Sequence, residues 1–444
     1  MESMLTDPIV ALATPPGRSA VAVVRVSGDG ALDVVERVVP GLPGLAPRVA
    51  TLARFVAADG SLIDRGLATV FRAPASFTGE DLVELSCHGG LATPARLLAA
   101  LQRAGARPAT AGEFTRRAVL NGKLGLLEAE AIADLVDSRA PMQARAALDQ
   151  LDGGLRRRLE ALRERAVELQ ALLTYQIDFP DEDDGPVPIE ALRAAHGALL
   201  DDVRRLLATA PGAERLRAGA LVVLAGRPNA GKSSLFNALL GAERTLVTEL
   251  PGTTRDAVEA GTTCEGWPIR LVDTAGLHAP EARLDQLGVE VSRRYLGAAD
   301  LVLLCVEGER ALEGEERDIA RDARALVVRT KADLAPAVTR ADALHVSAVT
   351  GEGLEALRLA IAARTFGAGG DALEPTLLRE RHRDALGRAD DELVAAAGHL
   401  GARGDALLAS HHLRMATGHL EELIGAVVAD DVLARVFADF CVGK

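Results

Sequence analysis

The segment Gly226-Arg-Pro-Asn-Ala-Gly231-Lys232-Ser233 decides the fold, because it matches the pattern GxxxxGK[ST]. It lies between an apolar run at 221–225 and a helical pattern at 234–240. In a strand–loop–helix of this kind, small residues let backbone N–H groups surround a phosphate, and the helix directs its positive end at the anion. Lys232 would neutralise the outer phosphates and Ser233 would coordinate Mg²⁺. The segment therefore predicts a nucleotide-binding α/β domain.

Further apolar runs at 269–272, 301–306 and 325–328 alternate with helical segments, a pattern typical of a parallel sheet. The run 269–272 is followed by Asp273-Thr274-Ala275-Gly276. This sequence would place a carboxylate near the metal and a glycine amide near the γ-phosphate. We therefore expect Asp273 to share the nucleotide site with the first loop.

Two later motifs indicate which base is bound. Thr330-Lys331-Ala-Asp333 follows the run 325–328, and Ser347-Ala348 follows another short strand-like run. A carboxylate at 333 can accept two hydrogen bonds from the edge of guanine, whereas adenine offers no matching pair of donors. The sequence thus predicts GTP and GDP as ligands, and ATP is the weaker interpretation.

A switch segment, Gly252-Thr253-Thr254-Arg-Asp256, lies between the first loop and Asp273, and we expect Thr254 to be a second Mg²⁺ ligand. The residue after Gly276 is Leu277, which cannot orient a water molecule, so help with hydrolysis must come from elsewhere. The residues predicted to bind the nucleotide are Asn229, Ala230, Gly231, Lys232, Ser233, Ser234, Thr248, Glu249, Leu250, Pro251, Gly252, Thr253, Thr254, Asp273, Thr274, Ala275, Gly276, Thr330, Lys331, Asp333, Ser347 and Ala348.

Composition narrows the class of protein. The 444 residues exceed one compact core, and a formal charge of −13 disfavours nonspecific binding to nucleic acid. The basic stripe Arg156, Arg157, Arg158, Arg163 and Arg165 could contact RNA, although a solvated helix face explains it better. Four dispersed cysteines without a CxxC pair indicate a reducing cytoplasm. No apolar run approaches the roughly 20 residues that span a bilayer, so we expect no membrane anchor.

Pattern changes along the chain predict a multidomain protein of α/β and α class. Residues 1–120 mix short strand-like runs with one clear helix, which indicates an α+β domain. Residues 121–214 and 371–444 are rich in helical periodicity, and 215–370 carry the nucleotide motifs. One helical domain with the α/β unit inserted into it, or two separate helical domains, would both fit this order.

Beyond the nucleotide motifs, several short sequences occur in a fixed order along the whole chain. They are Ala13–Arg18, Val24–Gly28, Phe77–Asp81 with Glu84, His88–Gly90, Gly112–Thr115, Leu120–Lys123, Glu128–Asp134, Ile177–Asp181 and Phe440–Lys444. In this order the chain resembles the tRNA wobble-uridine modification GTPases of the MnmE (TrmE) family. Its inserted domain would then be a Ras-like P-loop GTPase domain with a mostly parallel sheet.

The resemblance implies an N-terminal domain that binds 5-formyltetrahydrofolate and forms a homodimer. It also implies a heterotetramer with an FAD-dependent partner of the MnmG (GidA) type. Together the two proteins would add an aminomethyl or carboxymethylaminomethyl group at C5 of the tRNA wobble uridine. Arg25, Glu84, Lys123 and Lys444 match the folate contacts of the family, and such a ligand offers amide-like edges and carboxylates to these side chains.

The same resemblance implies that K⁺ stabilises the charge that develops during hydrolysis, which fits the apolar Leu277. Asn229 matches the side-chain ligand of this ion, and Thr248, Leu250 and Thr253 match its backbone ligands. The family orients the attacking water with a glutamate, and the aligned residue here is Asp285, with Glu281 or Glu290 as substitutes. The predicted catalytic residues are Lys232, Thr254, Asp273 and Asp285.

Two other functions stay open from the sequence. A GTPase that controls ribosome assembly would carry an RNA-binding module after the nucleotide domain, where this chain has plain helical patterns. A folate-dependent one-carbon transferase regulated by GTP would place its chemistry in residues 1–120. Cys441, close to the C-terminus, could react with a one-carbon unit or could simply be a small apolar residue that fixes the tail.

Overall fold

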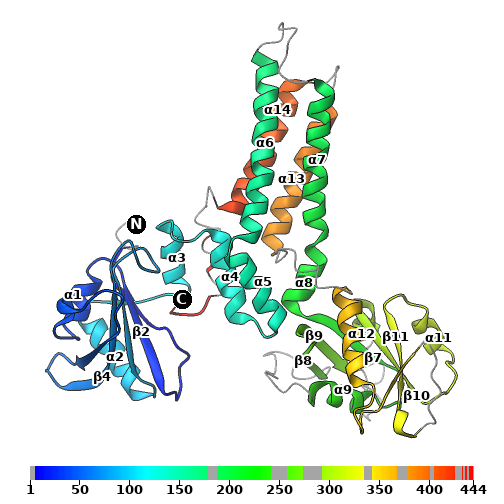
Figure 1. The fold of residues 1–444 in the computed structure, drawn as a ribbon, viewed down its shortest axis with the longest axis horizontal. Coiled ribbons are helices and arrows are strands. Elements are labelled where there is room, and N and C mark those ends of the chain that lie inside the picture. Colours follow the sequence, from blue (N-terminus) through cyan, green and yellow to red (C-terminus); the bar gives the residue numbers. More distant parts are fainter. Residues whose placement is uncertain are drawn as a thin grey trace, which may run out of the picture. The chain divides into compact units, whose positions relative to one another are not determined.

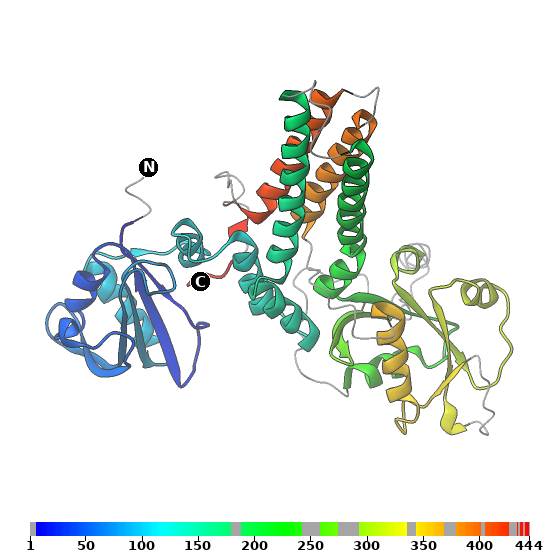
Figure 2. The same cartoon turned by 45° about the horizontal axis from the view of Figure 1, so that its top comes forward.

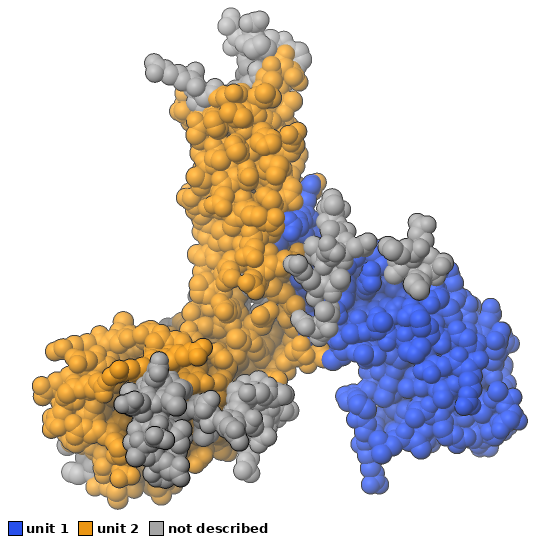
Figure 3. All heavy atoms as spheres, turned by 180° about the vertical axis from the view of Figure 1, so that it is seen from behind, with its two compact units in different colours: residues 1–133, 421–444 blue, residues 134–420 orange. Residues whose placement is uncertain are grey.

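The computed structural model describes residues 6–178, 188–241, 258–273, 293–334, 343–367, 379–400, 405–425, 433, 436–437 and 440–443. The chain divides into two compact units, Met1–Ala133 with Glu421–Lys444, and Asp134–Leu420. Figure 3 shows them in blue and orange. The multidomain fold with α/β and all-helical parts is confirmed, whereas the domain boundaries predicted at 120, 214 and 370 stay predictions.

The first unit contains a six-stranded sheet with the strand order β3-β4-β5-β2-β1-β6 (Figure 1). One face is covered by α1 (Ala31–Glu36) and α2 (Ala92–Arg103), which pack on apolar side chains that alternate along the strands. A 3₁₀ turn, η2, spans Leu42–Gly44. The strands are β1 (Ile9–Leu12), β2 (Val21–Ser27), β3 (Thr51–Val56), β4 (Leu62–Phe71), β5 (Leu82–His88) and β6 (Arg107–Pro108).

The C-terminal segment returns to this unit. Phe437 and Phe440 pack with residues of α4 (Leu126–Asp137), and Val442 forms a β-bridge with Ala111 just before α3 (Glu113–Leu120). Gly112 has a φ of 66°, and a Cβ there would lie 2.8 Å from the Cβ of Phe440. A glycine is therefore required where the tail crosses the start of α3.

A buried ion-pair network fastens α3 to the rest of the unit. Arg117 is 1% exposed, and its guanidinium contacts the carboxylates of Glu113, Glu80 and Asp7. Arg107 pairs with Glu113 at 2.7 Å and with Asp7 at 2.8 Å. Burial alone would raise the pKa of Glu113, but the hydrogen bonds from Arg107, Thr110 and Arg117 outweigh it and lower the pKa to about 2.

We expect Glu113→Gln to destabilise this unit by about 2 kcal/mol at pH 7, because the buried Arg117 and the partly exposed Arg107 each lose one of their carboxylate partners. A depressed pKa adds stability above the unfolded value and loses it as the pH falls through the folded value. The difference in melting temperature between parent and variant should therefore be full at pH 7 and shrink between about pH 4.5 and pH 2. A difference that stayed constant across this range would show that the charge of Glu113 contributes nothing.

The helices of the second unit form an elongated bundle in which α7 packs against both α6 and α13. Figures 1 and 2 show α14 running along the same bundle. His196 of α7 shares a hydrogen bond of 2.9 Å with the carbonyl of Leu393 in α13, which ties the segments before and after the nucleotide motifs. The helices are α5 (Pro141–Leu151), α6 (Gly154–Asp178), α7 (Ile189–Ala208), α8 (Ala210–Ala218), α13 (Glu380–His399) and α14 (Ala406–Ile424).

Several arginines of the basic stripe on α6 have local partners. Arg156 pairs with Glu160 at 3.5 Å, Arg165 pairs with Asp202 of α7, and Arg157 donates to a backbone carbonyl at 2.6 Å. These contacts support a solvated helix face rather than an RNA site. None of the helices in the described ranges is both long and apolar enough to cross a membrane.

A second six-stranded sheet, ordered β12-β11-β10-β7-β9-β8, carries the nucleotide motifs. Its strands are parallel except β8, an antiparallel edge strand that the sequence did not predict. Apolar clusters cover both faces, as expected for a parallel sheet. The strands are β7 (Ala220–Ala225), β8 (Val258–Cys264), β9 (Trp267–Asp273), β10 (Leu301–Glu307), β11 (Ala325–Thr330) and β12 (Leu344–Val346). The helices are α9 (Lys232–Gly241), α11 (Glu315–Ala320), η4 (Ala332–Leu334) and α12 (Leu354–Phe366).

Candidate nucleotide site

The phosphate-binding loop leaves the central strand β7 and enters α9. Gly226, the first residue of the loop, has a φ of 136°, and a Cβ there would lie 2.3 Å from the carbonyl oxygen of Cys305 in β10. Asn229 and Gly231 also have positive φ, at 65° and 83°. These positive φ values curl the backbone of the loop at the start of α9, and a loop of this kind can surround a phosphate with N–H groups.

Lys232, the first residue of α9, lies under this loop. It is 5% exposed, and its ammonium donates to the carbonyls of Gly226 and Arg227, both at 2.8 Å. Burial lowers the pKa of Lys232, while the carboxylate of Asp273 acts in the opposite direction. The single buried cation of the loop is thus held beside the backbone that would surround a phosphate.

Ser233 and Asp273 come together at the carboxyl end of β9. The Ser233 hydroxyl donates to Oδ2 of Asp273 at 2.6 Å, and the Asp273 side chain is buried. The two oxygens belong to the hard donor class that Mg²⁺ prefers. The sequence placed both residues at a metal, and the structure brings them into direct contact.

The base-recognition motifs meet on the other side of the loop. The buried Thr330 hydroxyl donates to the carbonyl of Ala230 at 2.7 Å, so the end of β11 is fastened to the phosphate loop. Asp333, in η4, is exposed, and its Oδ1 accepts a hydrogen bond of 2.6 Å from the buried Ser347 hydroxyl. One carboxylate oxygen is therefore held in place while the other stays available to a ligand.

A cavity of about 230 Å³ connects these parts and includes Gly231, Ser234, Lys331, Asp333 and Ala348 in its wall. Its aliphatic lining, which the sequence analysis did not include, is formed by Leu235, Leu334, Val346 and Val349. Leu334 and Val349 are strongly exposed apolar side chains that directly follow the two base motifs. That position in the sequence was the signal that could have identified them, because a flat base needs apolar surface on its faces.

Several predicted nucleotide residues lie outside the described residues, and their roles stay predictions. They are the switch residues Thr248, Glu249, Leu250, Pro251, Gly252, Thr253 and Thr254, the residues Thr274, Ala275 and Gly276, and the candidate acid Asp285. The described phosphate, metal and base residues converge on one region of the second unit. The arrangement can hold a triphosphate, a divalent cation and a base that donates two hydrogen bonds.

The predicted folate residues lie in the first unit. Arg25 of β2 pairs with Glu84 of β5 at 2.7 Å and donates to the carbonyl of Gly443 at 3.4 Å, so the C-terminal tail reaches this pair. The Arg25 guanidinium also stacks within 5.5 Å of the Phe77 ring and 5.7 Å of the Phe114 ring. Lys123 lies just beyond α3, Cys441 is exposed in the tail, and Lys444 is outside the described residues.

Comparison with known proteins agrees with this geometry. Residues 126–441 match the family model described as the MnmE helical domain, and residues 8–123 match the GTP-binding protein TrmE N-terminus. Proteins named tRNA modification GTPase MnmE are similar over nearly the full chain. The one from Thermus thermophilus is 44% identical and covers 99% of both chains. That from Methylorubrum populi is 45% identical, with 99% of this chain and 98% of its own covered.

A relative from Akkermansia muciniphila, also named tRNA modification GTPase MnmE, is 38% identical and covers 99% of this chain and 100% of its own length. The family model of the helical domain spans well over half of the chain. These matches confirm the resemblance inferred from the motifs and the assignment of GTPase activity. The chain belongs to the MnmE (TrmE) family of tRNA modification GTPases.

Proposed function

We propose that this GTPase acts in the modification of tRNA at C5 of the wobble uridine, together with an FAD-dependent partner of the MnmG type. The observation that carries the proposal is the convergence of Lys232, the Ser233–Asp273 pair and Asp333 on one site in a chain whose relatives are named for tRNA modification. GTP hydrolysis would drive a conformational switch, and the group added would be aminomethyl or carboxymethylaminomethyl. The cytoplasm stays the expected location.

A direct experiment is depletion of the chain in its host, followed by nucleoside analysis of total tRNA. We expect the C5-substituted wobble uridines to disappear and to return when the parent chain is supplied, but not when Lys232→Ala is supplied. Unchanged nucleosides after depletion would contradict the proposal. Co-purification of a flavoprotein with the tagged parent chain tests the predicted heterotetramer in the same cells.

Mg²⁺ fits the described residues, because the Ser233 hydroxyl and the Asp273 carboxylate present hard oxygen donors 2.6 Å apart at the phosphate end of the site. When bound with GTP, the ion would neutralise charge on the β- and γ-phosphates. Lys232 would exchange its two carbonyl partners for phosphate oxygens, and the loop amides would hold the same phosphates in place. Thr254 and Asp285 are the predicted further ligand and water-orienting acid.

For K⁺, the described member of the predicted set is Asn229, whose left-handed backbone places it at the tip of the phosphate loop. We expect GTP turnover to rise at least about tenfold when Na⁺ is replaced by K⁺ at constant ionic strength, because a bridging cation offsets developing charge. Asn229→Ala should remove most of this difference while GDP binding persists. Equal rates of the parent protein in the two salts, measured by phosphate release, would exclude the ion assignment.

A 5-formyltetrahydrofolate site is supported by the Arg25–Glu84 pair, the flanking rings of Phe77 and Phe114 and the approach of the tail at Gly443. The guanidinium and carboxylate can pair with the amide-like edge of a pterin, and the rings provide apolar surface for it. Lys123 and Lys444 are the predicted partners of the glutamate carboxylates. Cys441 is exposed beside this region, but its role stays open.

The β3–β4 part of the N-terminal sheet supports a homodimer, because its apolar side chains are exposed there. On the face opposite α1 and α2, Leu52 pairs with Leu67 across β3 and β4, and Leu67 pairs with Ser86. Leu52 is 73% exposed and Leu67 is 43% exposed. Adjacent apolar side chains on a sheet face mark an interaction surface. A second copy of the chain is the occupant that we propose.

Leu67→Glu should convert the dimer to a monomer, because a charge would be buried in the interface. Leu91→Glu is the matched control, since Leu91 is 81% exposed in the loop before α2. Sedimentation velocity at micromolar concentration should show a monomer for the first variant and a dimer for the control. A parent protein that already sediments as a monomer would contradict the proposal.

A further inference from the structure

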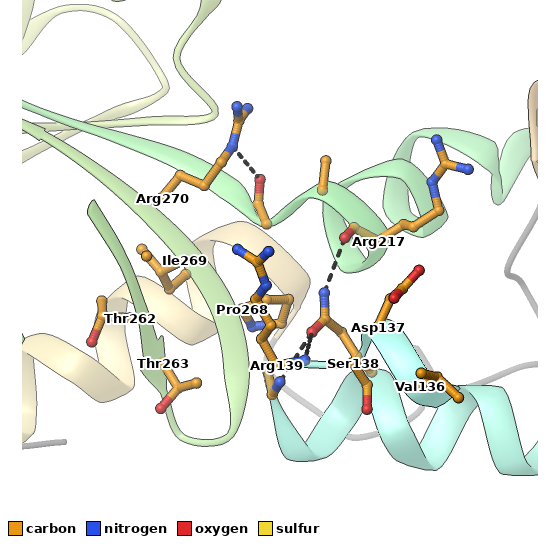
Figure 4. Close-up of a pocket in the computed structure, with 15 residues that line it drawn as sticks. Val136, Asp137, Ser138, Arg139, Arg217, Thr262, Thr263, Pro268, Ile269 and Arg270 are labelled. Atoms are coloured by element: carbon orange, nitrogen blue, oxygen red, sulfur yellow. Dashed lines mark hydrogen bonds between the residues drawn. The ribbon is translucent and has the colours of Figure 1, made fainter. Parts of the chain in front are cut away.

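The second unit contains a cleft of about 780 Å³ that is separate from the nucleotide residues (Figure 4). Three segments form it. They are the end of α4 with the turn into α5 (within residues 136–143), the end of α8 with the residue before β7 (217–219), and parts of the β8–β9 hairpin. All three lie where the helical part of the unit meets the α/β sheet. None of the predicted nucleotide, metal or folate residues is in its lining.

The charged side chains of this lining are basic in excess. Arg139, Arg217 and Arg270 line the cleft with a single acidic side chain, Asp137, and Arg270 is paired with Glu259 at 3.4 Å. This excess contrasts with the whole chain, whose formal charge is −13. Cations grouped at a hollow in an acidic protein mark a site for an anion.

Two of these arginines are also free. Within the described ranges, the guanidinium groups of Arg139 and Arg217 make no hydrogen bond or ion pair. Both side chains are exposed. By contrast, Arg204 and Arg165 of the neighbouring bundle have acidic partners, Asp390 and Asp202. Free guanidinium groups that have not been neutralised locally can pair with an external anion at little cost.

The backbone that carries the free arginines is firmly held. The Gln143 side chain accepts from the amides of Arg139 and Ala140, and donates to the carbonyls of Leu216 and Arg217, all between 2.8 and 3.0 Å. Figure 4 shows the bond to the carbonyl of Arg217 and the contact of Arg270 with the carbonyl of Gly219. The hydroxyl oxygen of Thr262 is buried without a hydrogen-bond partner among the described residues. The backbone positions of Arg139 and Arg217 are thus fixed relative to each other before any ligand arrives.

The placement of charge favours a long polyanion over a small one. Arg139 and Arg217 are exposed, whereas Ala140, Gly219, Pro268 and Ile269, which also line the cleft, are buried and uncharged. A small anion held deep in a cleft needs buried donors, whereas a backbone of repeated phosphates that lies across the opening can reach two rim cations at once. Guanidinium groups suit phosphates because they donate hydrogen bonds in pairs.

We propose that this cleft binds the phosphodiester backbone of RNA, with Arg139 and Arg217 each contacting a phosphate. The inference rests on the proposed tRNA function and adds where the chain contacts its substrate. The stripe on α6, which has local partners, does not take this role. The contacts orient the RNA without reading its bases.

The test is an Arg139→Gln/Arg217→Gln double variant, compared with an Arg204→Gln/Arg321→Gln control that removes two exposed, acid-paired arginines elsewhere in the same unit. Binding of an unmodified tRNA transcript is measured at KCl concentrations between about 50 and 300 mM, where binding to phosphates depends strongly on salt. We expect the double variant to bind about tenfold more weakly. The plot of log K against log salt concentration has a negative slope, and its magnitude should decrease by about 1.4 to 1.8 because two phosphate contacts are lost.

The control should keep the slope and affinity of the parent, and GTP turnover without RNA should be the same in all three proteins. A double variant whose slope and affinity equal those of the control would overturn the cleft assignment. So would saturable binding of inorganic phosphate that the double substitution abolishes while tRNA binding is unchanged, since the cleft would then serve a small anion. If the parent chain bound no tRNA at all, the proposed function would fall as well, which separates the two failures.

Discussion

Asp333→Asn should lower the affinity for GTP by at least about a hundredfold and create measurable affinity for xanthosine triphosphate. The carboxylate is the acceptor for the two donors on the guanine edge, and each hydrogen bond to a charged group is worth about 1.5–3 kcal/mol. Asparagine replaces one acceptor oxygen with an amino group that opposes the guanine donors. Xanthine has a carbonyl where guanine has its exocyclic amino group, and the amino group of the asparagine can donate a hydrogen bond to this carbonyl.

The matched control is Ser347→Ala, which leaves the Asp333 carboxylate intact but removes the hydroxyl that holds its Oδ1 at 2.6 Å. Loss of one orienting hydrogen bond should cost about 1 kcal/mol, or roughly fivefold in affinity, without any gain for xanthine. Titration with fluorescent GDP and competition with xanthosine nucleotides measure both effects. If Asp333→Asn bound GTP as tightly as the parent, the cavity beside η4 would not be the base site.

The grouping of the described motif residues in one region could be predicted because these motifs are contiguous and local. The glycines of the loop Gly226–Ser233 indicate its backbone conformation. Asp273 is the last residue of β9, and Asp333 lies three residues after the end of β11. Carboxyl ends of parallel strands meet at one edge, so adjacency in space follows from the strand pattern. The hydrogen bond of the Thr330 hydroxyl to the phosphate loop could not be predicted in this way, because it joins two segments that are distant in sequence.

Lysine is rare in this chain. Lysine occurs four times among the fifty basic residues, at 123, 232, 331 and 444. Each lies in a segment predicted to bind folate or nucleotide, whereas arginine supplies the other cations, including the ion pairs of the bundle. Lysine is a compact point charge on a flexible stem, and arginine is a planar fork suited to pairing with carboxylates. All four lysines of the chain thus lie in segments predicted to bind a ligand.

Other features depend on contacts distant in sequence and could not be predicted. The edge strand β8 has the mixed sequence VEAGTTC, which carries little strand signal, and only its pairing with β9 defines it. The buried state of Arg117 depends on Asp7 and Glu80, far away along the chain. The anion site proposed at Arg139 and Arg217 could not be predicted either, because only the structure shows that these two arginines have no partner among the described residues.

Lys232→Ala should reduce GTP turnover by about 10²–10³-fold, because the buried ammonium is the cation of the loop that meets the outer phosphates. Its loss also leaves the carbonyls of Gly226 and Arg227 without their donor, so we expect stability to fall by about 1–2 kcal/mol. Arg321→Ala, which removes an exposed cation of the same unit, should change neither property. Phosphate release with thermal unfolding of both variants makes the comparison. Turnover that survived in Lys232→Ala would mean that hydrolysis takes place away from this loop, since no other buried ammonium in the described chain lies beside it.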